Sequence, residues 1–301
     1  VSTGFRAPAL MQQYFSSTRT IVSLVDGVVT VRTFPVNTPE AKLIGATPLR
    51  PEAAVNQSAG LVLHVPRLPR ITADIYRVSI HDRIGLRASV TDPSLTRLFE
   101  ENGLAGINGG NYFSNSTDTR TQGVDLIANH AFLLNGSGVL QMLGGFNRTR
   151  TVVTAIAPLP PQLARFPRAG FNRTGRGILE NGQPRQTITL TLNYTAGPLN
   201  LNLHNQHAGP TAQLDMTNPE VDQVVEAKWI TDARIAWQVR SRLTVAISGA
   251  NIFDVYPDET RDFKDGLSGQ GISTGGISRY PGALSAFGMN GRTLYLRLAY
   301  H

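Results

Sequence analysis

The chain has 301 residues, which is enough for one large domain or two small ones. Charged residues make up only 16% of it, against roughly 25% in typical soluble domains, and uncharged polar residues and 29 glycines take their place. No window approaches 18 consecutive apolar residues, which excludes transmembrane helices but leaves membrane β-strands open. The lack of cysteine excludes disulfides and cysteine-based metal sites.

The net charge of +7 comes almost entirely from arginine, with only three lysines in the chain. A pI near 10.0 would suit nucleic acid, but the arginines are scattered and no nucleic-acid-binding motif is present. We therefore expect no nucleic-acid partner. Arginine also binds phosphates bidentately, so outer-leaflet lipid and its anionic sugar-lipid, lipopolysaccharide, are expected partners.

Ten segments predict strands, because apolar and polar residues alternate along them with a period of two. In 187–195, for example, Ile188, Leu190, Leu192 and Tyr194 alternate with threonine and asparagine. Lengths near ten residues fit a tilted membrane crossing of about 9–11 residues. The ten ranges are 1–5, 57–65, 70–84, 121–133, 139–151, 187–195, 199–204, 228–239, 243–248 and 291–301.

The connections between these segments alternate between short and long. The short ones are 66–69, 134–138, 197–198 and 240–242, and the long ones are 6–56, 87–120, 153–184, 210–227 and 255–290. Five structureless loops on alternate connections would be unusual in a soluble β-sandwich, the alternative architecture. The pattern predicts an all-β, antiparallel, up-and-down transmembrane β-barrel with short periplasmic turns and long extracellular loops.

Two local features refine this prediction. In the loop 87–120, Asp92 and a following proline predict a capped short helix over 94–101, with Leu95, Leu98 and Phe99 on one side. In the last segment, Leu294, Leu296, Leu298 and Tyr300 are expected to face lipid, and Arg297 is expected to face the lumen.

Six motifs, in order from residue 4 to residue 292, resemble those of TonB-dependent outer-membrane receptors. They are GFRAPAL at 4–10, LRPE at 49–52, ADIYRV…DRI at 73–84, NSTDTRTQGVD at 115–125, NIFD…YP at 251–257 and GR at 291–292. We expect structural rather than ligand-binding roles for the motif residues Gly4, Phe5, Arg6, Pro8, Pro51, Glu52, Asp74, Tyr76, Thr121, Gly123, Asp125, Asn251, Phe253, Asp254, Gly291 and Arg292.

The resemblance implies a barrel of about 22 strands filled by a plug domain. Residues 1–301 would then be about ten C-terminal strands, with the plug domain and the N-terminal strands expected ahead of Val1. Each unpaired backbone group costs several kcal/mol in hydrocarbon, so ten strands with two open edges are not expected to insert stably or transport alone.

The resemblance also implies a function in the bacterial outer membrane. Such receptors import a scarce ligand, such as a siderophore, cobalamin or a glycan, with energy delivered by the TonB complex. Expected partners are that complex, reached through the N-terminal region, the receptor's own plug domain and the small-molecule ligand. No enzymatic activity, cofactor or metal is expected.

Ligand contacts are expected from aromatic and arginine side chains on the long loops. Arginine interleaved with aromatic rings could clamp an anionic ligand, or it could hold sugar-lipid phosphates at the rim. The isolated aromatics could stack on a ligand or anchor at the membrane interface. The candidates are Tyr14, Phe15, Tyr112, Phe113, Arg165, Phe166, Arg168, Phe171, Arg173 and Arg176.

Three alternatives remain open. A passive porin would show ungated flux. A barrel enzyme would need acid and base groups such as His81, Asp82, Asp118 and Asp254, but none of these lies in a nucleophile motif. A metal site at His204 and His207 is disfavoured, because strand residues three apart face opposite sides.

Overall fold

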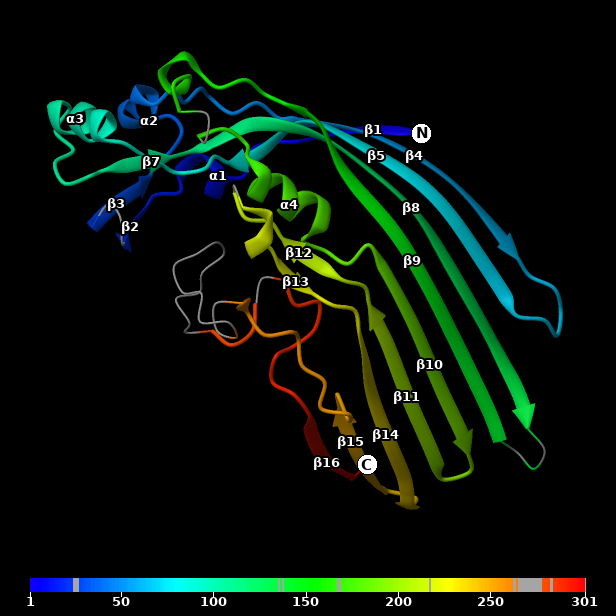
Figure 1. Cartoon of the computed structure of the whole chain (residues 1–301). Helices are drawn as coiled ribbons and strands as arrows, with labels where there is room; N and C mark the ends of the chain where they lie inside the picture. The colour runs from blue at the N-terminus through cyan, green and yellow to red at the C-terminus, as the bar shows by residue number, and fades with distance from the viewer. Residues whose placement is uncertain are drawn as a thin grey trace. The chain divides into compact units, whose positions relative to one another are not determined.

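The computed structural model describes residues 1–23, 27–134, 136, 138–166, 169–216, 218–261, 264, 278–281 and 284–300. Ten strands form one sheet in the order β1-β4-β5-β8-β9-β10-β11-β14-β15-β16 (Figure 1). Their bounds are β1 Ser2–Arg6, β4 Glu52–Leu63, β5 Arg70–Leu86, β8 Phe113–Leu134, β9 Gly138–Ile156, β10 Gln186–Ala196, β11 Leu199–Ala208, β14 Lys228–Arg240, β15 Leu243–Ala250 and β16 Thr293–Tyr300.

All ten predicted strands are confirmed, and neighbours in the sheet follow one another along the chain apart from elements inside the long loops. Every pair from β9 to β16, and the pair β1–β4, is antiparallel. This is the up-and-down arrangement that the alternation of short and long connections predicts. Strands β1 and β16 are the ends of the order, so each has one neighbour within the described residues.

The chain divides into two compact units, each of which contains part of the sheet. Unit 1 comprises Val1–Gln57, Arg77–Thr121 and Thr151–Glu180, and unit 2 comprises Ser58–Tyr76, Gln122–Arg150 and Asn181–His301. Unit 1 also holds the elements of the first three long loops. These are α1 Leu10–Tyr14, β2 Ser17–Ser23, β3 Gly27–Thr33, α2 Pro39–Leu43, β6 Val90–Thr91, α3 Pro93–Glu101, β7 Gly109–Asn111, η1 Pro161–Leu163 and most of α4 Arg173–Asn181.

These loop segments fold together around a hydrophobic core of their own, and we call this part of unit 1 the loop subdomain (10–46, 87–113 and 159–169). Its sheet has the order β2-β3-β7-β6, in which β3 and β7 are parallel. Phe34 and Phe99 lie at the centre, with ring centroids 5.5 Å apart, and Tyr112 is 1% exposed. Burying such large side chains supplies the stabilisation that an isolated loop lacks.

Helix α3 confirms the predicted capped helix. Asp92 is the N-cap residue and its carboxylate accepts a hydrogen bond from the Ser94 backbone N–H at 2.8 Å. Leu95 and Phe99 are buried in the core, and Leu98 packs against it half-buried. The cap begins the helix, and this apolar side attaches it to the subdomain.

In unit 2 the register separates the sheet into two faces. A polar row crosses six strands on one face, through Gln141, Asn193, Asn202, Arg234, Ser248 and Tyr295. The adjacent row on the opposite face is apolar, through Leu140, Tyr194, Leu201, Ile235, Ile247 and Leu296. One wet and one apolar face is the pattern of a barrel wall between lumen and lipid.

The last strand, β16, follows the predicted division of faces. Leu296 and Leu298 pair with Ile247 and Val245 on the apolar face, whereas Arg297 pairs with Ala246 on the polar face. The leucines are highly exposed, at 69% for Leu296 and 67% for Leu298. Exposed leucines in a row are unfavourable in water and suit a lipid contact.

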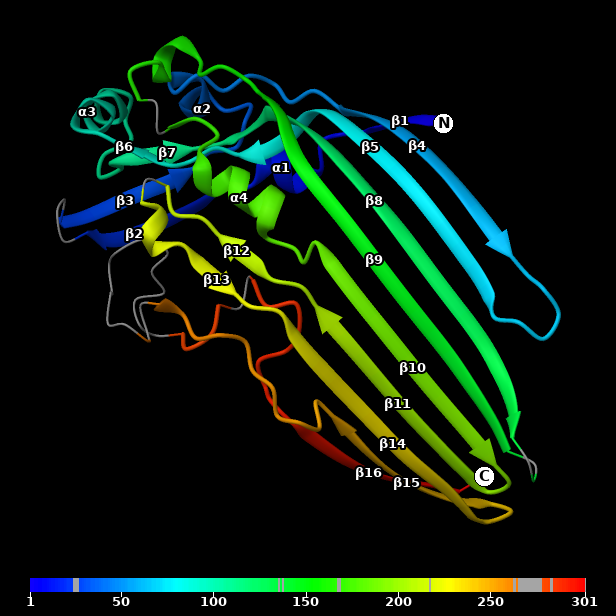
Figure 2. The same cartoon turned by 45° about the vertical axis from the view of Figure 1, so that its right-hand side comes forward.

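Short turns lie together at one end of the strands of unit 2 (Figure 2), where β10 is joined to β11 and β14 to β15. The β10–β11 connection consists of Gly197 and Pro198, and Gly197 has a φ of 53°. Positive φ is readily adopted by glycine, which allows the strand to reverse in so short a turn.

Aromatic side chains mark the two ends of the apolar face. Trp229 pairs with His207 near the long-loop end of β14, and Trp237 pairs with Leu199 near the turn end. Eight residues span about 26 Å along a strand, or about 20 Å across a membrane at the usual tilt. Two aromatic levels at this separation resemble the girdles of an outer-membrane barrel.

The remaining long loops of unit 2 contain short elements. Strands β12 Thr211–Gln213 and β13 Gln223–Val225 form an antiparallel pair, with η3 Pro219–Val221 between them. Much of the predicted loop 255–290 lies outside the described residues. Among the described residues, every helix is too short or too polar to cross a lipid bilayer.

Gly123 provides a test of close packing in the sheet. A Cβ at this position would collide with the ring of Tyr76, whereas a Cβ at Gly4 meets nothing within 4 Å. We expect Gly123→Val to lower the free energy of unfolding by about 1–3 kcal/mol through overpacking. Urea-induced unfolding of the full-length protein in lipid vesicles measures this change, with Gly4→Val as the matched control. Truncating the ring with Tyr76→Ala in the same chain should relieve the collision; equal stability of the two valine variants would contradict it.

Candidate functional site

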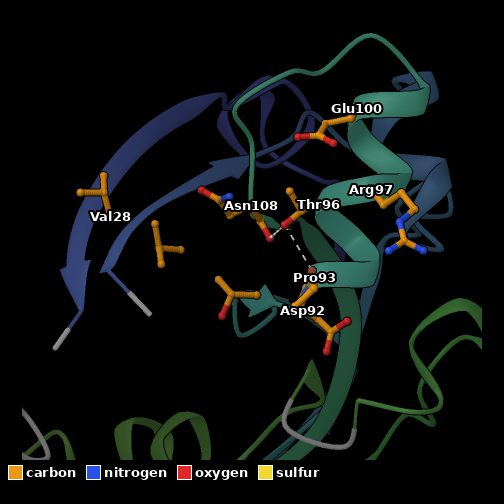
Figure 3. Close-up of a pocket in the computed structure, with 9 residues that line it drawn as sticks. Val28, Asp92, Pro93, Thr96, Arg97, Glu100 and Asn108 are labelled. Carbon is orange, nitrogen blue, oxygen red and sulfur yellow. Dashed lines mark hydrogen bonds between the residues drawn. The ribbon is translucent and has the colours of Figure 1, made fainter. Parts of the chain in front are cut away.

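A pocket of about 470 Å³ opens in the loop subdomain between the β2–β3 hairpin and α3 (Figure 3). Val28 and Val29 line it from the hairpin, Asn108 lines it from the segment before β7, and Thr96 and Glu100 line it from the helix. Thr96 and Glu100 are four residues apart, so they lie on the same side of α3. The pocket therefore combines an apolar wall with polar groups on the opposite side.

Asn108 is held by the neighbouring strand. Its side-chain oxygen accepts a hydrogen bond from the Thr30 backbone N–H at 2.8 Å, and its own backbone N–H donates to the Thr30 carbonyl at 2.8 Å. Its amide nitrogen has no hydrogen-bond partner within the described part of the chain, and the Glu100 carboxylate has none there either. A fixed donor and a free acceptor thus face the pocket (Figure 3).

Thr96 contributes less hydrogen-bonding capacity to the pocket. Its hydroxyl lies 3.3 Å from the carbonyl oxygen of Asp92 and 3.4 Å from that of Asn108 (Figure 3). The first contact lies within the N-cap of the helix, and the second joins the helix to the segment that carries Asn108. Thr96 therefore positions the two walls of the pocket.

The N-cap of α3 connects this pocket to the loop 153–184. Hydrogen bonds from the hydroxyl and the backbone N–H of Ser94 lower the pKa of Asp92, and the nearby guanidinium of Arg165 lowers it further. Arg165 donates to the Ser94 hydroxyl at 2.6 Å and lies over the ring of Phe166, 4.8 Å from its centroid. Arg165 is thus engaged with the protein itself.

The structure brings some of the predicted aromatic candidates together. Phe15 and Phe113, from different loops, meet edge to face with ring centroids 6.5 Å apart. Tyr14 is 63% exposed. Phe166 packs half-buried against the core, and Tyr112 lies inside it, where burial raises the pKa of its phenol. The Tyr112 ring is therefore not presented on the surface for a ligand.

The described arginines of the loop 153–184 each have a partner within the protein. Arg176 pairs with Glu180 on the next turn of α4 at 3.0 Å, and Arg173 also has an interaction partner. Phe171 packs close to Gly175 at the start of the same helix. Arg168 lies outside the described residues.

The motif residues near the start of the chain form a compact contact. Arg6 donates to both carboxylate oxygens of Glu52, at 2.9 and 2.7 Å, and the Ile84 backbone N–H donates to the same carboxylate at 2.7 Å. Glu52 is 7% exposed, so these bonds compensate the cost of burying its charge. Of the neighbouring motif residues, Phe5 is 81% exposed, Pro51 is exposed, and the Pro8 carbonyl accepts from Gln13.

The motif residues of the middle strands also contact one another. The Thr121 and Thr151 hydroxyls lie 2.8 Å apart, and Asn147 donates to Asp125. Tyr76 lies over Gly123, and Asp74 lies close to Gly60. These contacts join neighbouring strands, and a structural role for the motif residues stays a prediction.

The motifs at the end of the chain join β15 to β16. Asn251, with a φ of 49°, exchanges two hydrogen bonds with the backbone of Val255. The Asp254 carboxylate accepts from the Arg292 backbone N–H at 2.8 Å, and its hydrogen bond with Tyr256 raises the pKa of that tyrosine. Gly291 has a φ of 67° and leaves no room for a Cβ beside Tyr256, while Phe253 is 70% exposed.

The residues considered for a metal site and for an enzyme site have other partners. His204 hydrogen-bonds Thr191 on the polar face, whereas His207 packs against Trp229 on the apolar face. His81 and the Asp82 backbone N–H both bind Asp118, and Asp82 also pairs with Arg50. Asp254 binds Arg292 instead, so the four proposed acid and base groups are divided between separate contacts.

Sequence reasoning missed Glu100 and Asn108. Each is a single polar residue with no motif around it, and the two come from separate segments that line one pocket. The helix prediction over 94–101 did place Glu100 opposite the buried side of α3, which was the available signal. Its neighbours across the pocket depend on tertiary structure.

Comparison with known proteins identifies the family to which the sequence and the fold correspond. Residues 1–252 match the family model described as TonB dependent receptor-like, beta-barrel. No curated protein matches the sequence. Among solved structures, a variant of the ferric enterobactin receptor PfeA from Pseudomonas aeruginosa aligns with a TM-score of 0.58 and 14% identity, over 99% of this chain and 37% of that one.

Two further structures show the same fold. The outer membrane transporter YddB from Escherichia coli has a TM-score of 0.53 at 14% identity, over 84% of this chain and 33% of that one. The pyoverdine receptor FpvA from Pseudomonas aeruginosa, bound to pyoverdine, has a TM-score of 0.52 at 13% identity, over 85% of this chain and 31% of that one. The chain thus spans about a third of the length of these proteins.

The lowered pKa of Asp92 gives a pH-dependent prediction for α3. A carboxyl with a lower pKa in the folded than in the unfolded protein gives its full stabilisation above the unfolded value of about 3.9, and loses it as the pH falls through the folded value. We expect hydrogen-exchange protection of the first turn of α3 to decrease when the pH is lowered below about 3.9. Asp92→Asn keeps a neutral cap and should show no such fall. The same acid response in both proteins would contradict the role of the carboxylate.

Proposed function

Because the chain belongs to the TonB-dependent receptor-like β-barrel family, we propose that it serves the energised import of a scarce ligand across the bacterial outer membrane. Proteins of this family are transport receptors of that membrane, and the structural neighbours include receptors for ferric enterobactin and pyoverdine. The observation that carries the proposal is the division of the sheet into a polar and an apolar face, with loops that fold into a subdomain. A siderophore, cobalamin or a glycan would be a suitable cargo.

The ten strands form a section of the barrel wall in this proposal. Strands β1 and β16 each have one neighbour within the described residues, so both would pair with further strands of a complete barrel. A plug domain inside that barrel and a TonB-contacting segment ahead of it would supply gating and energy.

Uptake by cells that express the full-length gene product tests the import. The probes are labelled ferric enterobactin, ferric pyoverdine, cyanocobalamin and a malto-oligosaccharide. We expect one of them to accumulate, and accumulation to stop when an uncoupler dissipates the proton gradient or when TonB is deleted. Accumulation that survives both treatments would show a passive porin, and no energy-dependent accumulation of any probe would overturn these ligand classes.

Within this function, we assign a ligand contact to the pocket lined by Glu100 and Asn108. A free carboxylate and a free amide nitrogen beside an apolar wall suit a ligand that carries hydroxyl or amide groups as well as apolar surface. The charged acceptor contributes most, because hydrogen bonds to charged groups are worth about 1.5–3 kcal/mol.

The neighbouring acid on α3 provides a matched control for that pocket. We expect Glu100→Gln to raise the KM of energised uptake about tenfold, because the charged acceptor is lost while the shape is kept. Asn108→Asp should also raise KM, since it removes the donor but keeps the oxygen that binds Thr30. Glu101→Gln removes the same charge outside the pocket and should leave KM unchanged. An equal effect of all three would contradict the assignment.

A further inference from the structure

An apolar groove of about 550 Å³ lies in unit 2, and its lining includes Gly144, Phe146, Ile188, Leu190, Asn205 and Trp229. The strand register places these side chains on the apolar face of the sheet, because Gly144 pairs with Leu190 and Phe146 pairs with Ile188. The groove exists because residue 144 has no side chain between the larger neighbours. It is therefore a hollow in the surface that faces lipid.

The groove has a positive end. Arg148 follows Phe146 on the same face of β9, where it pairs with Gln186, and the alternation places Arg150 there as well. Both side chains are exposed. Of the described side chains that face this way from β9, β10, β11 and β14 in unit 2, Arg148 and Arg150 carry the charge at the long-loop end, whereas Arg240, which pairs with Leu243 beyond a bulge in β14, lies at the tight-turn end. Within the described part of these four strands, no carboxylate lies on this face.

The spacing along β9 suits a lipid molecule. Strand β9 begins at a tight turn and runs toward the long-loop end, so Arg148 and Arg150 lie about 13 and 20 Å beyond Gly144 in that direction. Long loops of such barrels face the cell exterior, which puts the arginines at the outer headgroup level. The groove then lies below them, at the depth of the acyl chains, and the ring of Trp229 lies between an apolar and a polar environment.

We propose that this surface binds one phosphorylated glycolipid of the outer leaflet, with an acyl chain in the groove and a phosphate on Arg148 and Arg150. Two guanidinium groups bind a phosphate bidentately, whereas a zwitterionic phospholipid offers a weaker partner because its own amine competes. The site holds the lipid at one position on the wall rather than as part of the general lipid annulus. The inference rests on the outer-membrane location of the family and not on the import proposed above.

Filling the groove tests the acyl-chain part. A Cβ at Gly144 has the Ala128 carbonyl oxygen at 4.0 Å as its nearest neighbour, so Gly144→Leu adds bulk to the groove without a backbone collision. Ala233→Leu adds the same bulk on the same face, where Ala233 pairs with Leu203 and Gly249 away from the groove. Removing charge tests the headgroup part: Arg148→Gln with Arg150→Gln is compared with Arg240→Gln with Arg242→Gln at the tight-turn end.

The measurement is lipid binding by native mass spectrometry, with the full-length protein delipidated in detergent and titrated with lipid A, dephosphorylated lipid A and phosphatidylethanolamine. We expect one tightly held lipid A, bound about tenfold more weakly by the Gly144 variant and by the Arg148/Arg150 pair, with both controls unchanged. Dephosphorylated lipid A should bind the wild type as weakly as lipid A binds the arginine variant. Equal binding of phosphatidylethanolamine, or no loss in either test variant, would overturn the proposal.

Discussion

A hydrocarbon environment offers no partner for backbone N–H and C=O groups, and this constraint governs the ten-stranded sheet. In this sheet each strand between β1 and β16 has a neighbour on both sides, which satisfies its backbone in the plane of the sheet. The side chains are then free to differ between the two faces. Leucine, isoleucine and tryptophan gather on one face, and asparagine and threonine gather on the other. The amphipathic alternation of the sequence follows from this requirement.

The long loops obey a different rule, because they lie in water and need a hydrophobic core of their own. The loop subdomain provides one around Phe34, Phe99 and Tyr112, which lets its helices and short strands form a shaped pocket. The family motifs lie where the strands of the sheet continue into the long loops. The Arg6–Glu52 pair with the Ile84 amide, and the Asp254–Arg292 contact, fix neighbouring strands where they emerge into the loops.

The ten strands were predictable from sequence because apolar and polar residues alternate along them with a period of two, and because short and long connections alternate between them. The short strand β7 was not, since Gly109–Asn111 is three residues long and carries no alternation. Its parallel pairing with β3 joins segments almost eighty residues apart, and no local pattern reports such a contact. The pocket could not be predicted for the same reason, because Glu100 and Asn108 come from separate segments that line one pocket only in the tertiary structure. The described arginines of the loop 153–184 have protein partners, and their ligand-binding role stays a prediction.

The central claim is that this sheet separates lipid from an aqueous lumen, and adjacent residues of β16 test it most directly. The chain has no cysteine, so Leu296→Cys and Arg297→Cys each introduce a unique labelling position in it. Spin labels at these positions in the full-length protein in lipid vesicles would be probed by electron paramagnetic resonance with oxygen and a water-soluble nickel complex. We predict oxygen access at position 296 and nickel access at position 297. The same access profile at both positions would contradict the account.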